Sequence, residues 1–354
     1  MKKMLGLLAL TLAVSGVASA EQDFLKSISV DTNVRYRYQD LSGEDANGIG
    51  NEGFKKENRI RTRWLKTVSG TVVLSDEFGL EADFSVLHRN QTDRLGNEKL
   101  NKNEFWNPSL TLRKNVQLGN LDTTFKLKYE NETDRRRENG TTGPYKTRGI
   151  FNELTFGPEF KINLLGQNVS VDTGIVYFNV KGSSDKNLPY SASALDKGKA
   201  DGWGLNLNLA TDGTIAEGGF GKVTYGLEFI NKFRDVKGEF NGEKAGTNVY
   251  LDYLQNVKYT TPTFLGGFYG QLALENEWEK YTSVTGWNNN FDIVTGLGYS
   301  TSFDTAVGEV TVNPYTSYSV LNRDTSYNKH RENKRLTIER NELRAGLKVG
   351  LSVK

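Results

Sequence analysis

Charged side chains recur at every second position in several parts of the chain, and they are the residues with the clearest chemical potential. A basic set has this spacing in two neighbouring runs, and two further members share one parity near the C-terminus: Arg35, Arg37, Arg59, Arg61, Arg63, Arg344 and Lys348. An acidic set has it once: Glu275, Glu277 and Glu279. Alternate residues of a β-strand point to the same face, so each set would form a column of like charge. Such columns attract and orient ions, and guanidinium groups hold carboxylates through paired hydrogen bonds.

Residues suited to catalysis are scarce. The chain has two histidines and no cysteine, so neither a thiol nucleophile nor a disulfide framework is available. His88 shares its alternating face with apolar residues such as Val86, and His330 lies in a polar loop between Lys329 and Arg331. Neither belongs to a Ser/His/Asp arrangement, and no His/Cys cluster has metal-binding spacing. We therefore expect no enzymatic activity, no cofactor and no metal site.

The stretch from Ser27 to Gln39 shows which element positions the first arginines. One face of it is mostly apolar: Ile28, Val30, Thr32, Val34, Tyr36 and Tyr38. The other face is polar: Ser29, Asp31, Asn33, Arg35, Arg37 and Gln39. A period of two sustained over this length predicts a long strand between an apolar and a polar medium.

Runs of the same kind recur to the C-terminus, and short and long connections alternate between them. We count about 14 strands, an even number, as is typical of outer-membrane barrels with both chain ends on one side of the membrane. The long connections include the polar stretch from Asn90 to Glu104 and the segment around Arg136. The last strand is centred on residues 343–353 and must close on the first, which would bring the basic residues together.

The strand number decides which face is outward. Barrel diameter grows with strand number, and about 8 strands already give an interior that side chains fill. With about 14 strands, apolar faces turned inward would leave an unfilled centre, so we expect them to contact lipid. A large soluble β-sandwich or a secreted β-helix is the alternative, but its strands would be shorter.

Aromatic residues fall into two groups that support the outward orientation. Beside the long connections lie Tyr38, Tyr129, Tyr177, Trp203, Phe233, Trp278 and Tyr318, and beside the short turns lie Phe78, Phe160, Tyr225, Tyr259, Phe268 and Phe303. Two such groups are typical of the interfacial girdles of a transmembrane antiparallel up-and-down β-barrel.

Composition is compatible with this all-β prediction. Over 354 residues the mean hydropathy is -0.55, and no run after the N-terminus approaches the roughly 20 apolar residues of a membrane-spanning helix. The net charge of +2 gives no nucleic-acid footprint. The N-terminus predicts a signal peptide at residues 1–20, because Lys2 and Lys3 precede an apolar run that ends at the small residues Ala18-Ser19-Ala20. The barrel domain would then span residues 21–354. An uncleaved membrane anchor is the alternative to the signal peptide.

The chain resembles a bacterial outer-membrane porin. Its lysine-led signal, its alternating strands and the opening Arg35-Tyr36-Arg37-Tyr38 are similar to the major porins of fusobacteria. The resemblance implies a diffusion channel for small hydrophilic solutes that is embedded in outer-membrane lipid and commonly homotrimeric. The chain departs from most such barrels because it ends on Lys354 rather than on an aromatic residue.

The charged columns leave several functions open. Lining a lumen, they would set ion preference and orient dipolar solutes, or they would only keep the lumen wet and pair with each other. The arginines could also form a track for acidic oligosaccharides. The polar outer loops could act in adhesion.

Overall fold

The structure, a computed structural model, is all-β. It describes residues 25–42, 59–95, 98–119, 121–138, 146–164, 166–182, 199–237, 239–240, 243–244, 247–281, 287–306, 308–328 and 334–353. The strands are β1 (Leu25–Ser42), β2 (Arg59–Ser75), β3 (Leu80–Leu95), β4 (Glu98–Leu118), β5 (Leu121–Glu138), β6 (Lys146–Leu164), β7 (Gln167–Gly182), β8 (Lys199–Gly218), β9 (Gly221–Lys237), β10 (Glu239–Phe240), β11 (Glu243–Lys244), β12 (Thr247–Thr260), β13 (Phe268–Tyr281), β14 (Trp287–Tyr299), β15 (Thr301–Thr305), β16 (Gly308–Asn328) and β17 (Lys334–Val353). None of the described segments is a helix long and apolar enough to cross a membrane. The predicted signal peptide at residues 1–20 lies outside the described residues.

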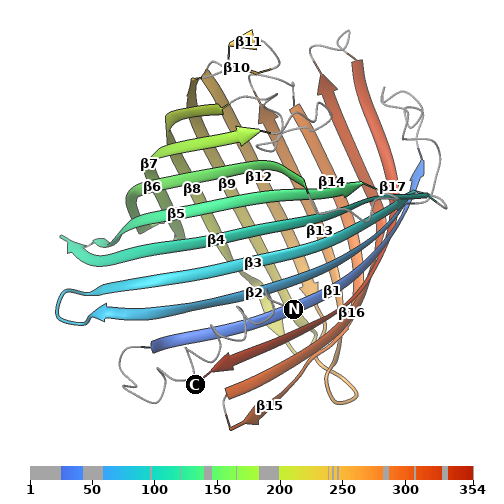
Figure 1. Ribbon diagram of the computed structural model, residues 1–354. Coiled ribbons are helices and arrows are strands. Elements are labelled where there is room, and N and C mark those ends of the chain that lie inside the picture. The colour runs from blue at the N-terminus through green and yellow to red at the C-terminus, as the bar shows by residue number, and fades with distance from the viewer. Residues whose placement is uncertain are drawn as a thin grey trace.

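One antiparallel sheet closes on itself, as predicted. Neighbours in sequence pair along the sheet, and β1 pairs with β17 from Ile28↔Val353 to Ser42↔Glu339. β16 pairs with both β14 and β15, so β15 continues the line of β14. The described residues thus form a closed barrel of 14 strands, with β10 and β11 as a separate hairpin. In Figure 1, β2 to β5 run across the front while β8 to β14 run from top to bottom behind them.

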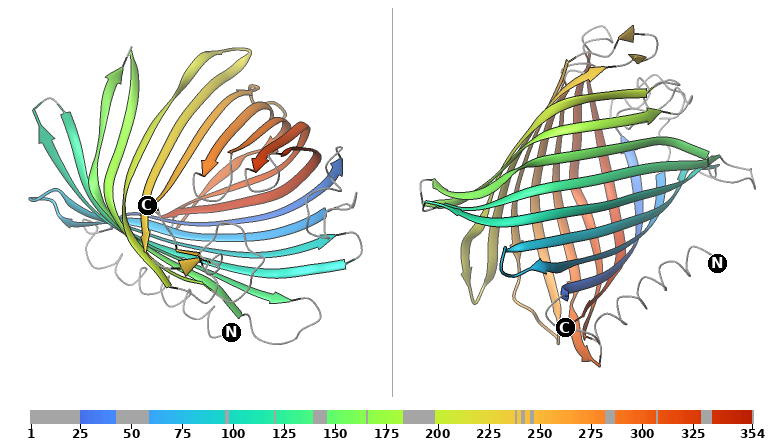
Figure 2. Two further views of the ribbon diagram at one scale, coloured as in Figure 1. Left: turned by 90° about the horizontal axis from the view of Figure 1, so that it is seen from above. Right: turned by 60° about the vertical axis from the view of Figure 1, so that its left-hand side comes forward.

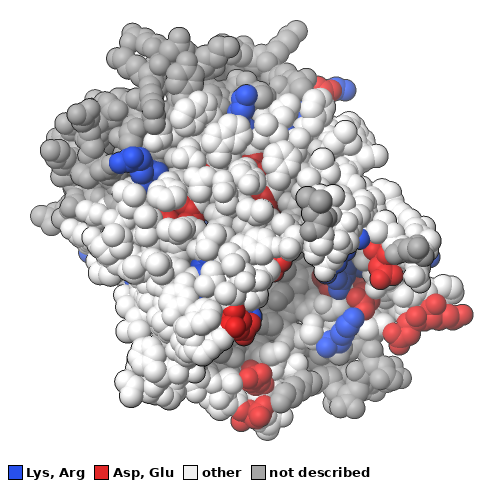
Figure 3. Space-filling model, turned by 180° about the vertical axis from the view of Figure 1, so that it is seen from behind, with Lys and Arg blue, Asp and Glu red and all other residues white. Residues whose placement is uncertain are grey.

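The apolar side chains point out of this barrel. Register partners in an antiparallel sheet share a face, and the partners Val34, Trp64 and Leu347 are 50%, 44% and 41% exposed. The same outward face continues over β6 to β8 with Phe156 and Leu205, which are 54% and 55% exposed. Figure 3 shows that the face turned away from the viewer in Figure 1 is dominated by uncharged residues.

A closed barrel with an apolar exterior satisfies every backbone group of its ladder internally, which is the condition for crossing lipid with strands. Together with the even strand number, this architecture places the chain in a bacterial outer membrane.

A short turn of seven residues connects β12 to β13. Leu265 has a φ of 46°, and Gly266 and Gly267 have positive φ values as well. Phe264 both donates to and accepts from the backbone of Phe268, which closes the turn. A Cβ on Gly267 would lie 2.7 Å from the carbonyl oxygen of Ser300, so this position requires glycine.

The strands extend further than predicted on the side of the long connections. The stretch from Asn90 to Glu104 is not a loop, because β3 continues to Leu95 and β4 begins at Glu98. The segment around Arg136 likewise lies in β5, and β17 begins at Lys334 rather than near residue 343. The extensions of β3, β4 and β5 are largely polar on both faces, so they lack the apolar alternation that identifies a strand, although the backbone ladder continues.

Candidate functional site

The basic residues of β1, β2 and β17 lie on one face of the barrel wall. Arg37 is the register partner of Arg61 on one side and of Arg344 on the other, and Arg35 is the partner of Arg63. Arg59 pairs with Gln39, and Lys348 pairs with Asn33, at positions of the same parity. This parity is opposite to that of the exposed apolar residues, so Arg35, Arg37, Arg61, Arg63, Arg344 and Lys348 face the lumen. The side chain of Arg59 lies outside the described part of the structure.

Three carboxylates that the sequence analysis did not single out are interleaved with the arginines. Glu342 has no exposed surface and forms ion pairs with both Arg37 and Arg344. Asp292 on β14 lies 3.5 Å from an Nη atom of Arg344. Asp93 on β3 accepts from Nε of Arg61 at 2.7 Å. These acids hold the guanidinium groups in place by charge-assisted hydrogen bonds.

The arginines outnumber these acids. A further inward arginine, Arg89, is the partner of Leu65 and lies 4.6 Å from the ring centroid of Phe105. The arginine wall then comprises Arg35, Arg37, Arg61, Arg63, Arg89 and Arg344, six arginines against three carboxylates. The wall so defined has more arginines than carboxylates, and Glu132 and Asp134 on β5 lie beside it near Arg89.

The acidic residues of β13 form the second column. Glu275, Glu277 and Glu279 are the partners of Asp292, Asn290 and Asn288 on β14, so they face the lumen as well. The column is therefore continuous with the arginine wall through Asp292.

A carboxylate cluster extends this column onto β12. Asp252, 5% exposed, is the partner of Glu279. Carboxylate oxygens of Asp252, Glu277 and Glu279 lie within 4.8 Å of one another, and the Tyr250 hydroxyl lies 2.8 Å from Asp252 and 3.2 Å from Glu279. An all-oxygen group of this kind suits a hard cation such as Ca²⁺.

The two columns are neighbours along the wall. β13 pairs with β14, β14 with β16, and β16 with β17, which pairs with β1. The near edge of the arginine wall, at β17 and β1, is three to four strands from β13 in a barrel of 14, so the acidic column adjoins that edge, while β2 and β3 lie five and six strands away. The strand order of the closed sheet sets these positions. Figure 2 shows the strands curving around the enclosed space.

Ion pairs also occur on the remaining wall. Lys126 on β5 lies 2.9 Å from Glu159 and 2.8 Å from Asp172. Arg234 on β9 lies 3.0 Å from Glu153 on β6, which bridges strands that are not adjacent in the sheet. Charges of both signs therefore line the lumen well beyond the two columns.

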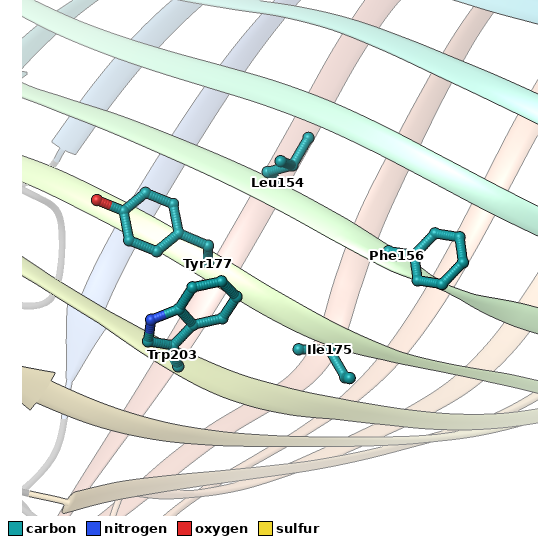
Figure 4. Close-up of a pocket in the computed structure, with 5 residues that line it drawn as sticks. All are labelled: Leu154, Phe156, Ile175, Tyr177 and Trp203. Carbon is teal, nitrogen blue, oxygen red and sulfur yellow. The ribbon is translucent and has the colours of Figure 1, made fainter.

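An apolar groove lies on the exterior of β6 to β8. It is lined by Leu154, Phe156, Ile175, Tyr177 and Trp203, which Figure 4 labels. All five have the outward parity, and the rings of Tyr177 and Trp203 are 5.2 Å apart. The groove is open to the surroundings of the barrel and not to its lumen.

His88 also lies on the exterior. Its ring stacks on Trp106 at 4.0 Å, and Nε2 lies 3.3 Å from Glu104. His330 lies outside the described residues.

Comparisons with known proteins give a loose likeness in structure alone. The sequence matches no family model and no curated protein. A FadL homologue of Pseudomonas aeruginosa is 10% identical over 92% of this chain and 90% of its own, with a TM-score of 0.38. The TodX monoaromatic hydrocarbon channel, as a deletion mutant, is 8% identical over 95% and 92%, with a TM-score of 0.40. A loop-deletion mutant of OmpT, an outer membrane protein of Vibrio cholerae, is 11% identical over 91% and 98%, with a TM-score of 0.36. At these scores the strand pairing described above, and not the likeness, carries the fold assignment.

Proposed function

We propose that the protein is an outer-membrane porin, a water-filled channel through which small hydrophilic solutes and ions diffuse passively. The observation that carries this proposal is the charged inward face of a closed 14-strand barrel. Charged groups on the lumen side require water, and a barrel of this strand number is wider than one that side chains fill.

The arrangement of charge makes selection by electrostatics the expected mechanism. An arginine wall and an acidic column on neighbouring parts of one wall create a field along the circumference of the lumen. A dipolar solute gains by aligning with that field, whereas an apolar solute of similar size must displace water without compensation. The channel would therefore favour polar solutes.

The test is conductance in a planar bilayer under a salt gradient, with the full mature chain after refolding in detergent. The proposal predicts discrete, stepwise currents. We would replace five arginines of β1 and β2 by glutamine: Arg35, Arg37, Arg59, Arg61 and Arg63. This change should shift the reversal potential toward cation preference. A silent bilayer from protein with the expected β-sheet content would contradict the channel, and an unchanged reversal potential would remove these arginines from the ion path.

A track for acidic oligosaccharides is the second candidate, and the excess of arginine over carboxylate in the arginine wall favours it. Guanidinium groups bind carboxylates in pairs, so an acidic oligosaccharide should block ion current at concentrations where its neutral counterpart does not. Equal block by both sugars would count against the track.

Two further expectations remain predictions of the sequence. The homotrimer implied by the porin resemblance is tested by light scattering of the detergent-solubilised protein. A role of the outer loops in adhesion is tested by binding to host-cell surfaces after loop deletion.

A further inference from the structure

Several cations lie close together on the exterior of β2 to β5, towards one end of the barrel. Three rows of register partners define it: Thr62–Thr92–Lys102–Arg137, Trp64–Asn90–Glu104–Arg135 and Lys66–His88–Trp106–Thr133. All three contain residues of the same outward parity as Trp64. Arg94, the exposed partner of Ile60, lies one position further along the same face. We call Lys66, Arg94, Lys102, Arg135 and Arg137 the outer basic patch.

The outer basic patch lies towards the end of the barrel away from the chain termini. At the other end Leu25 pairs with Val72 and Ile28 with Val353, next to the short turns. Short turns are periplasmic in barrels of this kind, so the patch lies at the outer rim. Four of its five cations, all except Lys66, lie on the strand extensions that the apolar alternation did not predict.

Two tryptophans fix the depth of the patch. Trp64 and Trp106 lie in its two lower rows, and tryptophan concentrates at the boundary between hydrocarbon and lipid head groups. Nζ of Lys66 lies 3.7 Å from the ring centroid of Trp64, as expected when a lysine reaches from the apolar region toward that boundary. Cations above these rings are at the level of the head groups.

The charged side chains of the three rows are predominantly positive. Glu104 is the one carboxylate in the three rows, and it lies 3.2 Å from Arg135 and 3.3 Å from His88. Five cations therefore surround a single carboxylate on this face. The exterior groove on β6 to β8, by contrast, is lined by uncharged residues alone.

We propose that the outer basic patch binds the phosphorylated head group of an anionic membrane lipid. Arginine and lysine hold phosphate oxygens by charge-assisted hydrogen bonds, and Trp64 and Trp106 would pack against the acyl chains. A second copy of the chain fits this patch less well, because a two-fold contact would bring the five cations against their own copies.

The test is native mass spectrometry of the full mature chain in non-ionic detergent. The probe is lipid A, a diphosphorylated glycolipid, compared with the same lipid after removal of both phosphates. The wild-type protein should retain the phosphorylated form and not the dephosphorylated one. Inorganic phosphate at the same concentration should not compete, since it has no acyl chains to pack against the tryptophans.

A variant pair locates the site. R94Q/K102Q/R137Q should weaken binding of lipid A on the order of 100-fold, at about fivefold for each cation near an anionic surface. The control K114Q/K161Q/K222Q removes three lysines near the short turns and should bind as the wild type does. The variant keeps Arg135 so that Glu104 retains its partner.

Three results would overturn the proposal. Equal retention of both lipid forms by the wild type would remove the role of phosphate. Equal affinities of the two triple variants would place the site elsewhere. Loss of an oligomer in R94Q/K102Q/R137Q with unchanged lipid binding would make the patch an interface between copies.

Discussion

Replacing Glu342 by glutamine isolates the electrostatic contribution of the arginine wall. Glu342 has no exposed surface, and it bonds Arg37 and Arg344, whose side chains are 17% and 24% exposed. These two arginines are register partners, so E342Q leaves two like charges side by side. Removing one partner from a buried ion pair costs about 3–5 kcal/mol. Because lumen water reaches both arginines, the loss in unfolding free energy should be at the lower end, about 3 kcal/mol.

The assay is urea unfolding in phospholipid vesicles, followed by the fluorescence of the five tryptophans. The matched control is E309Q, which removes the same charge from β16 near the short turn, where Glu309 pairs in register with Asp304. The control should lose less than about 0.5 kcal/mol, the usual range for a surface change. The double variant R37Q/E342Q should lose less unfolding free energy than the sum of the losses of the two single variants. In the double variant both members of the ion pair are neutral, so neither charge remains without its partner.

The same variant has a predicted effect on conduction. With E342Q the wall has six arginines against two carboxylates, so the reversal potential should move toward anion preference. An unfolding free energy for E342Q that equals that of E309Q would refute the assignment of Glu342 as the charge that holds the wall together.

Two further predictions address the acidic column and the outward face. E275Q/E277Q/E279Q should shift permeability toward anions, because it removes three lumen carboxylates, and the reversal potential under a salt gradient measures the shift. L205R should lower the unfolding free energy by about 2–4 kcal/mol, the cost of an arginine on the lipid face, whereas N206R on the lumen face should cost far less. Equal costs in vesicle unfolding would reverse our assignment of the two faces.

The sequence predicts the barrel because the membrane imposes a period of two. From Ile28 to Tyr38 each outward residue must suit lipid, so the alternation records the strand and its orientation. Beyond the apolar belt neither face meets hydrocarbon, and residues such as Gln91 and Asp93 carry no such record. For this reason the upper halves of β3 and β4 resemble a loop in the sequence although their backbones remain paired.

The partners within the lumen could not be predicted in the same way. Glu342 stands two positions before Arg344, a spacing that places both on one face, and this was the available signal. Its pairing with Arg37 depends on the register between the first and last strands, which no local pattern specifies. The position of the acidic column beside the arginine wall likewise follows from the strand order of the closed sheet.

The pairing of β1 with β17 makes folding of this protein an all-or-none event. The ladder that closes the sheet joins the first described strand to the last, so it forms at the greatest loop-closure cost that the chain offers. Until it forms, β1 and β17 are open edges whose unpaired backbone groups cannot enter hydrocarbon and can pair with other chains instead. The nascent polypeptide must therefore stay protected from aggregation in the periplasm until its final strand arrives. A chain that stops before Lys334 would keep an open edge regardless of how many strands it had already formed.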